Sequence, residues 1–251
     1  MGLLDKFKKA ENRTADYFFK TDLHSHLIPG VDDGVKSWDE TKQVLQQLHE
    51  WGVENIVTTP HIKSDIFPNE EEKLISYFNE LKAVAVQTYP QMKVAIAAEY
   101  YLDETFIEKL NKNKSILTFG DNYVLFETSH SIESPFFTEI VFEMRNRCYK
   151  PILAHPERYA YCFGHKSKLE KMYGTDVFFQ LNINSLSGYY GEQPQKMAEW
   201  LIEQKMVDFV GTDCHGVRHL PHLEKGLASK SYQKLLSLPI LNHSIFDNRS
   251  V

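Results

Sequence analysis

The fold is decided by residues 17–52, which read YFFKTDLHSHLIPGVDDGVKSWDETKQVLQQLHEWG. The run Tyr17–Leu23 favours a β-strand, and a polar loop follows it. Ser37 and Glu40 then have the S-x-x-E spacing of a capping box, which predicts a helix over Trp38–Trp51. The apolar side chains of this helix share one face: Val44, Leu45, Leu48 and Trp51.

The same succession of a β-rich run and a helical pattern recurs along the chain. Alternation of this kind is typical of βαβ units around a parallel sheet. Seven units favour an α/β barrel, and a doubly wound open sheet is the alternative because alternation alone fits both. The β-rich runs are Tyr17–Leu23, Val53–Thr58, Lys93–Ala98, Tyr123–Phe126, Pro151–Ala154, Val177–Ile183 and Val207–Gly211. Further helices are expected over Asn69–Tyr89, Glu192–Lys205 and Leu223–Leu236.

The domain organisation is expected to be simple. An α/β barrel commonly forms one domain at about this length, and no Pro/Gly/Ser-rich linker divides the 251 residues. We therefore expect a single domain over residues 1–251, with residues 1–16 as an N-terminal helical extension.

Charge and cysteine content limit the partners and the compartment. The formal net charge of −6 argues against nucleic acid as the main partner. The three cysteines form no CxxC pair, and no signal-peptide pattern opens the chain, so a reducing cytoplasm is expected. No apolar run approaches the roughly 20 residues of a membrane-spanning helix, so no stable membrane insertion is expected.

Residues of types that can bind metals follow almost every predicted strand. The carboxyl ends of parallel strands lie on one face of an α/β fold, so side chains distant in sequence are expected to converge there. The candidate ligands are His24, His26, Asp33, His61, Glu99, Glu127, His155, Asp213 and His215.

The spacing and type of these residues indicate a cluster of metal ions. In His24-x-His26 the two side chains project to the same side of an extended strand, and Asp213-x-His215 repeats that geometry. Mixed histidine and carboxylate ligands suit Mn, Fe or Zn. Nine ligands exceed what one ion needs, so two or three ions are expected, with Glu99 and Glu127 able to bridge neighbours.

Several residues are left out of the predicted site. A lone histidine is more often structural than a ligand, and the pairs Tyr100-Tyr101 and Tyr189-Tyr190 are more often packing than substrate contacts. The histidines interpreted as structural are His49, His130, His165, His219, His222 and His243, of which His130 and His222 are the ones expected near the mouth of the site.

The motifs together resemble the PHP (polymerase and histidinol phosphatase) superfamily from about Thr21 to Gly216. Within it, the segments HSHLIPGVDDG (24–34), TPH (59–61) and HPER (155–158) are similar to those of bacterial tyrosine phosphatases of capsular and exopolysaccharide operons. The resemblance implies a distorted seven-stranded (β/α)7 barrel of the TIM-like, PHP type. It also implies a centre of three metals, often manganese, held by the candidate ligands above.

The resemblance implies that the chain hydrolyses phosphotyrosine on a protein. The implied protein substrate is a bacterial tyrosine kinase of polysaccharide assembly. Metal ions lower the pKa of bound water and hold phosphate oxygens for attack. Arg158, close after the ligand His155, is expected to bind phosphate oxygens, and His61 and Asp213 complete the catalytic set. A phenolate leaving group needs little proton donation, so no general acid is assigned.

Three alternatives remain open. A phosphatase of small molecules such as histidinol phosphate would use the same metals with a more closed pocket. A nuclease is disfavoured by the acidic balance and by the absence of a basic stripe. A metal-stabilised module that binds the kinase without turnover would keep the ligands but show no hydrolysis.

Overall fold

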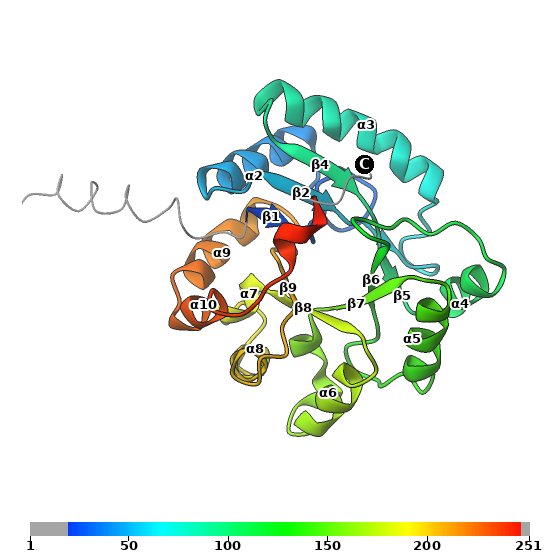
Figure 1. Ribbon diagram of the computed structural model, residues 1–251. Helices are drawn as coiled ribbons and strands as arrows, with labels where there is room; N and C mark the ends of the chain where they lie inside the picture. The colour runs from blue at the N-terminus through cyan, green and yellow to red at the C-terminus, as the bar shows by residue number, and fades with distance from the viewer. Residues whose placement is uncertain (1–19, 247–251) are drawn as a thin grey trace, which may run out of the picture.

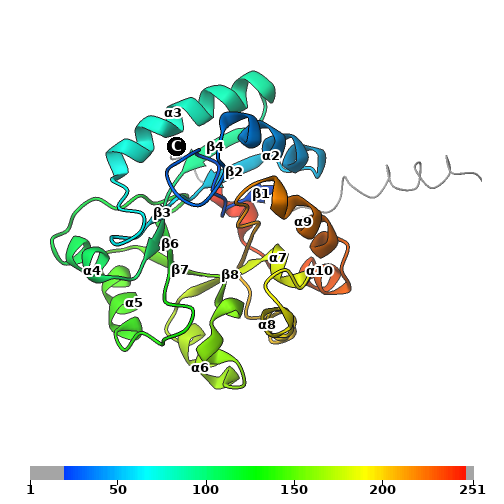
Figure 2. The same cartoon turned by 180° about the vertical axis from the view of Figure 1, so that it is seen from behind.

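Strands lie in the middle of the molecule and helices surround them, in a computed structural model that describes residues 20–246 (Figures 1 and 2). This confirms the predicted α/β alternation. The strands are β1 Thr21–Asp22, β2 Asn55–Thr58, β3 His61–Ile62, β4 Lys93–Ile96, β5 Glu99–Tyr101, β6 Tyr123–Glu127, β7 Lys150–Ala154, β8 Phe178–Asn182 and β9 Phe209–Gly211. The α-helices are α2 Trp38–Glu50, α3 Glu71–Thr88, α4 Glu104–Asn111, α5 Phe137–Asn146, α6 Lys166–Tyr173, α7 Ile183–Leu186, α8 Glu192–Glu203, α9 Leu220–Leu227 and α10 Lys230–Leu235.

All strand pairs in the regular ladders are parallel, as expected for βαβ units. They form two sheets, one in the order β1-β2-β4 and one in the order β3-β5-β6-β7-β8-β9. Two short strands were not predicted: β3 follows the predicted run Val53–Thr58, and β5 follows the predicted run Lys93–Ala98. Both belong to the second sheet, whereas β2 and β4 belong to the first. The break between β2 and β3 contains Pro60, which has no N–H to donate to a ladder. Over residues 20–246 the ladders thus do not form one closed seven-stranded sheet.

Side chains of a strand alternate between two apolar clusters. On β6, Val124 and Phe126 belong to the large cluster that includes the helix side chains. Tyr123 and Leu125 belong to a smaller cluster, together with Leu23, Val57 and Phe209. Because successive side chains point to opposite faces, Glu127 continues the line of Tyr123 and Leu125. The alternation that builds the core therefore also aims a carboxylate toward the strand-lined interior.

Helix α2 confirms the predicted start and corrects half of the predicted cap. The Ser37 hydroxyl accepts a hydrogen bond from the backbone N–H of Glu40 at 3.2 Å. The Glu40 carboxylate does not return to Ser37 but accepts from the N–H of Lys36 at 2.8 Å and of Val217 at 3.1 Å. Glu40 therefore ties the start of α2 to the loop that follows β9.

The predicted helix Leu223–Leu236 is wrong as a single element. Helix α9 ends at Leu227, and α10 begins at Lys230. The Ser229 side chain accepts a hydrogen bond from the N–H of Tyr232 and so caps a new helix start. The apolar periodicity continues across the break because both helices bury their apolar side chains in the same core.

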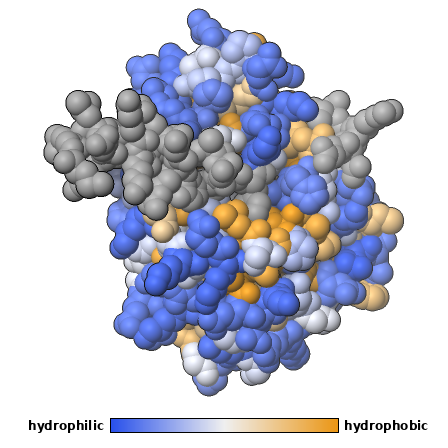
Figure 3. All heavy atoms as spheres, turned by 60° about the vertical axis from the view of Figure 1, so that its left-hand side comes forward, coloured by the Kyte–Doolittle hydropathy of each residue, from blue (hydrophilic) through white to orange (hydrophobic). Residues whose placement is uncertain are grey.

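The surface is mostly hydrophilic on the side shown in Figure 3, with apolar side chains gathered near the middle of that face. Within residues 20–246, none of the helices combines the length and the apolar character that crossing a membrane requires. The expected N-terminal helical extension, residues 1–16, lies outside the described residues.

Candidate metal centre

The buried centre of the site is a pair of histidines that face each other and two carboxylates. The Nε2 atoms of His24 and His26 lie 3.3 Å apart. Glu99 Oε2 lies 3.1 Å from His24 Nε2 and 3.4 Å from His26 Nε2, and Asp213 Oδ1 lies 3.4 Å from both. All four side chains are almost completely buried. The predicted convergence of the strand ends is thus present in the fold.

The other nitrogen of each ring is already occupied. Nδ1 of His24 lies 2.8 Å from Gln180 Oε1, and Nδ1 of His26 lies 2.7 Å from Asp32 Oδ2. Because an amide oxygen and a carboxylate only accept hydrogen bonds, each Nδ1 carries the proton, which leaves Nε2 of a neutral ring with its lone pair. Two lone pairs and two carboxylates therefore point at the same small volume, an arrangement that a positive charge between them would stabilise.

Further ligand atoms extend this centre toward the cavity. His61 Nδ1 lies 3.2 Å from Glu99 Oε2 and 3.7 Å from Glu127 Oε1. His155 Nε2 lies 2.9 Å from Glu99 Oε1 and 3.7 Å from Glu127 Oε2. Glu99 and Glu127 thus each lie between several rings, as expected of carboxylates that bridge neighbouring ions. The histidine–carboxylate cluster consists of His24, His26, His61, Glu99, Glu127, His155, Asp213 and His215.

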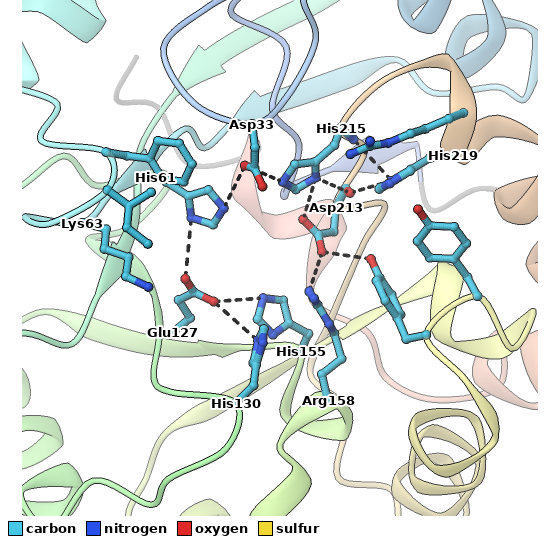
Figure 4. A pocket seen from close by; sticks show the side chains of 15 residues that line it. Asp33, His61, Lys63, Glu127, His130, His155, Arg158, Asp213, His215 and His219 are labelled. Carbon is cyan, nitrogen blue, oxygen red and sulfur yellow. Dashed lines mark hydrogen bonds and ion pairs between the residues drawn. The ribbon is translucent and has the colours of Figure 1, made fainter.

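Asp33 has a more exposed position than the other predicted ligands. Its Oδ1 lies 3.3 Å from His215 Nε2 and 3.6 Å from His61 Nε2, at the rim above the buried centre (Figure 4). Its neighbour Asp32 is buried, and besides His26 it accepts a hydrogen bond from the N–H of His61 at 3.0 Å. Asp32 therefore orients the ring of His26 and fixes the backbone of His61, a role that the sequence did not reveal.

The residues present fit a group of divalent cations. Each of four sets of side chains brings its ligand atoms within 4.8 Å of one another, and every predicted ligand except Asp33 occurs in at least one set. His61 Nδ1 is buried and makes no hydrogen bond among the described residues, although Glu99 Oε2 lies 3.2 Å away. An imidazole nitrogen in this state is suited to a metal, since a buried polar atom without a hydrogen bond is otherwise costly. The donor chemistry, histidine mixed with carboxylate, suits Mn, Fe or Zn.

The electrostatics of the site also favour positive charge. Burial lowers the pKa of His24, but the charges of Glu99 and Asp213 outweigh burial and raise the pKa to about 9. Burial raises the pKa of Glu99, and the histidines around it reverse that and hold its pKa well below the usual range. Glu127 differs, because burial and the charge of Glu99 raise its pKa well above the usual range. A bound cation would take the place of the proton that His24 attracts.

Two members of the cluster have backbones in the left-handed region, His155 with φ of 36° and Asp213 with φ of 49°. His155 directly follows β7, and Asp213 follows β9 after one residue. A non-glycine residue in this backbone region carries strain. The turn after His155 is held by Glu157, a buried carboxylate that accepts from Asn182 N–H at 3.0 Å and from the Ser185 hydroxyl at 2.6 Å. Burial raises the pKa of Glu157 to about 7.

Arg158 lies at the edge of the cluster. Its Nη1 donates to Asp213 Oδ2 at 3.1 Å, and its guanidinium lies 4.1 Å from the centre of the Tyr190 ring. Asp213 Oδ2 also accepts from Asn182 Nδ2 at 2.6 Å and from the Tyr190 hydroxyl at 3.2 Å. Arg158 is thus held in front of the buried ligands by a carboxylate and an aromatic face.

A cavity of about 420 Å³ opens above the cluster. Figure 4 shows His61, Glu127, His155, Arg158, Asp213 and His215 around it. Its remaining walls are basic or apolar, and they include residues that the sequence interpretation did not assign: Lys63, Ile66, Phe67, His130, Tyr189, Tyr190, Arg218 and His219. We call it the site cavity.

Some of the missed residues left a signal in the sequence and others did not. His130 follows Glu127 by three residues, and its Nε2 lies 3.6 Å from Glu127 Oε2, so its expected place near the mouth is correct. His130 also completes a possible ligand set with Glu127 and His155. Tyr190 belongs to a pair interpreted as packing. No motif pointed to it, because its partner Arg158 is adjacent only in the folded chain.

The fold and the cluster define an α/β protein with a buried group of histidines and carboxylates that could hold metal ions. The family model for capsular polysaccharide synthesis proteins, CpsB/CapC, matches residues 20–241, and the chain belongs to this family.

Two relatives and one solved structure agree with this assignment. The tyrosine-protein phosphatase CpsB of Streptococcus pneumoniae is 30% identical over 209 residues, 80% of this chain and 84% of the relative. The putative tyrosine-protein phosphatase CapC of Staphylococcus aureus is 29% identical over 207 residues, 82% and 81% of the two chains. A chain from the crystal structures of YwqE from Bacillus subtilis and CpsB from Streptococcus pneumoniae, described as unique metal-dependent tyrosine phosphatases, matches with a TM-score of 0.77. It is 22% identical, and the match covers 92% of this chain and 96% of that one. The resemblance found in the motifs is confirmed.

Proposed function

We propose that this chain is a metal-dependent phosphatase that hydrolyses phosphotyrosine on a protein, a bacterial tyrosine kinase that controls capsular or exopolysaccharide synthesis. The observation that supports it most is the histidine–carboxylate cluster at the base of the site cavity, with Arg158 at its edge. The relatives named above as tyrosine-protein phosphatases support the same reaction.

The proposed ligands are those predicted from the sequence: His24, His26, Asp33, His61, Glu99, Glu127, His155, Asp213 and His215. We propose two or three ions of Mn²⁺, with Fe or Zn as possible replacements. When bound, such ions would lower the pKa of water, supply the nucleophile near neutral pH and neutralise phosphate charge.

The side chains of the site cavity have separate roles in this proposal. Arg158 would exchange its contact with Asp213 for phosphate oxygens and stabilise the negative charge that they carry during transfer. His61 and Asp213 complete the proposed catalytic set, because both hold ligand atoms at the floor of the site cavity. Ile66, Phe67 and Tyr189 provide apolar surface for the phenyl ring of the substrate. A phenol leaves without strong acid assistance, so no general acid is proposed.

We propose that the chain forms one domain over residues 1–251, with the fold of a seven-stranded (β/α)7 barrel of the PHP type. We also propose that the protein is located in the cytoplasm. Support for closure comes from the contact between the first and last strand runs. Ser25 and Cys214 form a parallel bridge, and the N–H of Asp213 donates to the carbonyl of His24 at 2.8 Å. The N–H of His26 donates in turn to the carbonyl of Cys214 at 3.0 Å.

The test is phosphate release from a phosphotyrosyl peptide and from histidinol phosphate, measured after chelation and again after addition of Mn²⁺. We expect faster hydrolysis of the peptide, and only with metal. If histidinol phosphate is hydrolysed faster, the substrate is a small molecule and the proposed substrate class is wrong. If neither substrate is hydrolysed with any divalent metal, the chain is a metal-stabilised module that binds its partner without turnover.

Arg158→Ala tests the proposed role of the guanidinium. We expect kcat/KM for the peptide to fall by about 10²- to 10³-fold, as for other lost transition-state donors. Arg145→Ala is the matched control, because Arg145 is an exposed arginine of α5 that pairs with Asp176. Equal activity of both variants would contradict the role of Arg158.

A further inference from the structure

A second cavity adjoins the site cavity on the far side of Arg158. It measures about 460 Å³ and lies between the turn around Phe163 and the start of α8. We call it the side cavity. Three residues line both cavities, namely His130, Arg158 and Tyr190. The two cavities therefore meet at a shared wall that includes Arg158, the residue proposed to bind the phosphate.

The side cavity has mainly apolar or uncharged walls. Phe163 is half-buried, Pro194 is buried, and the Tyr190 ring is held by its contact with Arg158. Among the described residues that line it, only Arg158 and Glu192 carry a formal charge at neutral pH, and Arg158 is already paired with Asp213. A cavity with this lining suits an aromatic or aliphatic side chain better than a charged one.

Gly191 lines the side cavity, and no side chain fills the space above its Cα. A methyl group placed on its Cα would meet no atom within 4 Å, and its φ of 101° is a conformation that glycine adopts readily. The bare backbone at this point leaves room directly above the start of α8. The volume is also in the range that binding sites for small groups occupy, roughly 300–1,000 Å³.

We propose that the side cavity is a substrate subsite that binds an aromatic or aliphatic side chain located within three residues of the phosphotyrosine. The proposal rests on the proposed function, since it assumes that a phosphotyrosyl peptide is hydrolysed in the site cavity. Continuity of the two cavities identifies the occupant, because a peptide whose phosphotyrosine contacts Arg158 from one side continues along the shared wall. Neighbouring residues of an extended peptide advance by about 3.3 Å each, which brings them to the side cavity within a few positions.

The test compares phosphopeptides of equal length and charge. Each has one phosphotyrosine flanked by alanines, and a single phenylalanine is moved through positions −3 to +3. We expect kcat/KM to rise by about fivefold to tenfold at one or two positions, the effect of partly burying one large apolar side chain. A lysine or glutamate at the same positions is expected to give no increase.

Two variants locate the effect in the side cavity. Phe163→Ala enlarges it, and Gln193→Trp, at an exposed position, fills it; both are expected to reduce the phenylalanine-to-alanine ratio to about one. Phe142→Ala is the matched control, since Phe142 is exposed on α5 and lines neither cavity. It should keep the full ratio.

Free phosphotyrosine distinguishes failure of the subsite from failure of the proposed function. If it is hydrolysed but phenylalanine has no effect at any position, the subsite is overturned and the phosphatase stands. The same holds if both variants keep the full ratio. If neither free phosphotyrosine nor any peptide is hydrolysed with metal, the proposed function is overturned and the subsite with it.

Discussion

The two ends of the same strands have opposite chemistry. Strands β6, β8 and β9 begin with the aromatic residues Tyr123, Phe178 and Phe209, whose rings pack edge to face with centres 5.1 to 5.8 Å apart. Four residues after each of these aromatics comes a polar group of the site: Glu127, Asn182 and Asp213. One short strand therefore contributes both to a dry aromatic layer and to a charged cluster.

The difference shows how the protein separates stability from chemistry. The aromatic layer at the amino ends gains free energy by leaving water, and it needs no ligand to do so. The cluster at the carboxyl ends buries carboxylates and imidazoles, which costs free energy unless cations offset it. A substitution at one end should therefore affect mainly stability, and a substitution at the other mainly activity.

The largest expected effect is at the carboxyl ends. Glu99→Gln keeps the shape of the side chain but removes the charge that lies between His24, His61 and His155. We expect kcat/KM for a phosphotyrosyl peptide to fall by about 10³-fold or more, with less metal bound per chain. Metal analysis and circular dichroism of the purified variant check this.

Glu108→Gln is the control for this substitution, because Glu108 is an exposed residue of α4 that pairs with Lys112. It should leave kcat/KM unchanged. Near-normal activity of the Glu99 variant would show that the cluster is not the reaction centre, and the comparison between the two ends would fail.

The next effect is at the amino ends. Phe209→Ala removes a completely buried ring from the aromatic layer, and we expect the free energy of unfolding to fall by about 3–5 kcal/mol. The folded fraction should keep its metal and its kcat, because the Phe209 ring packs on Tyr123 and Phe178 at the other end of the strands. Urea denaturation followed by fluorescence measures the first quantity and steady-state kinetics the second. A loss of metal affinity at full folding would contradict the separation.

The smallest effect concerns a carboxylate at the amino end. Asp208 accepts from the N–H of Phe179 at 2.8 Å and from the Tyr173 hydroxyl at 3.1 Å, and burial raises its pKa. The folded state thus binds this proton more tightly than the unfolded chain does. Its contribution to stability is full below the ordinary pKa of 3.8 and is lost as pH rises through the raised folded value.

Asp208→Asn removes this titration, so the wild-type protein should lose stability relative to the variant as pH rises above about 4. Chemical denaturation of both proteins from pH 4 to pH 7 gives the difference at each pH, in which the titrations of all other groups cancel. If the difference in stability does not change with pH, the pKa of Asp208 is the same in the folded and unfolded states, and the prediction is wrong.

Much of the site could be predicted because its residues follow strands in a regular way. Glu99, Glu127 and Asp213 come at the ends of apolar runs, and parallel strands bring those ends together. Asp32 and Gln180 could not be assigned in this way. Each acts by holding the outer nitrogen of a ligand ring, and such a contact depends on where the two rings lie after folding.

The sequence alone determined the alternation of strands and helices, the parallel pairing and the set of nine candidate ligands, because local periodicity and strand-end position are properties of the chain itself. Tertiary structure decided where the helix after Leu220 breaks, how the ladders divide into two sheets at Pro60, and that Arg158 meets Tyr190 and Asp213. It also decided that a second cavity adjoins the first. These features depend on contacts between residues far apart in the chain, and the free energy of such contacts has no trace in local sequence pattern.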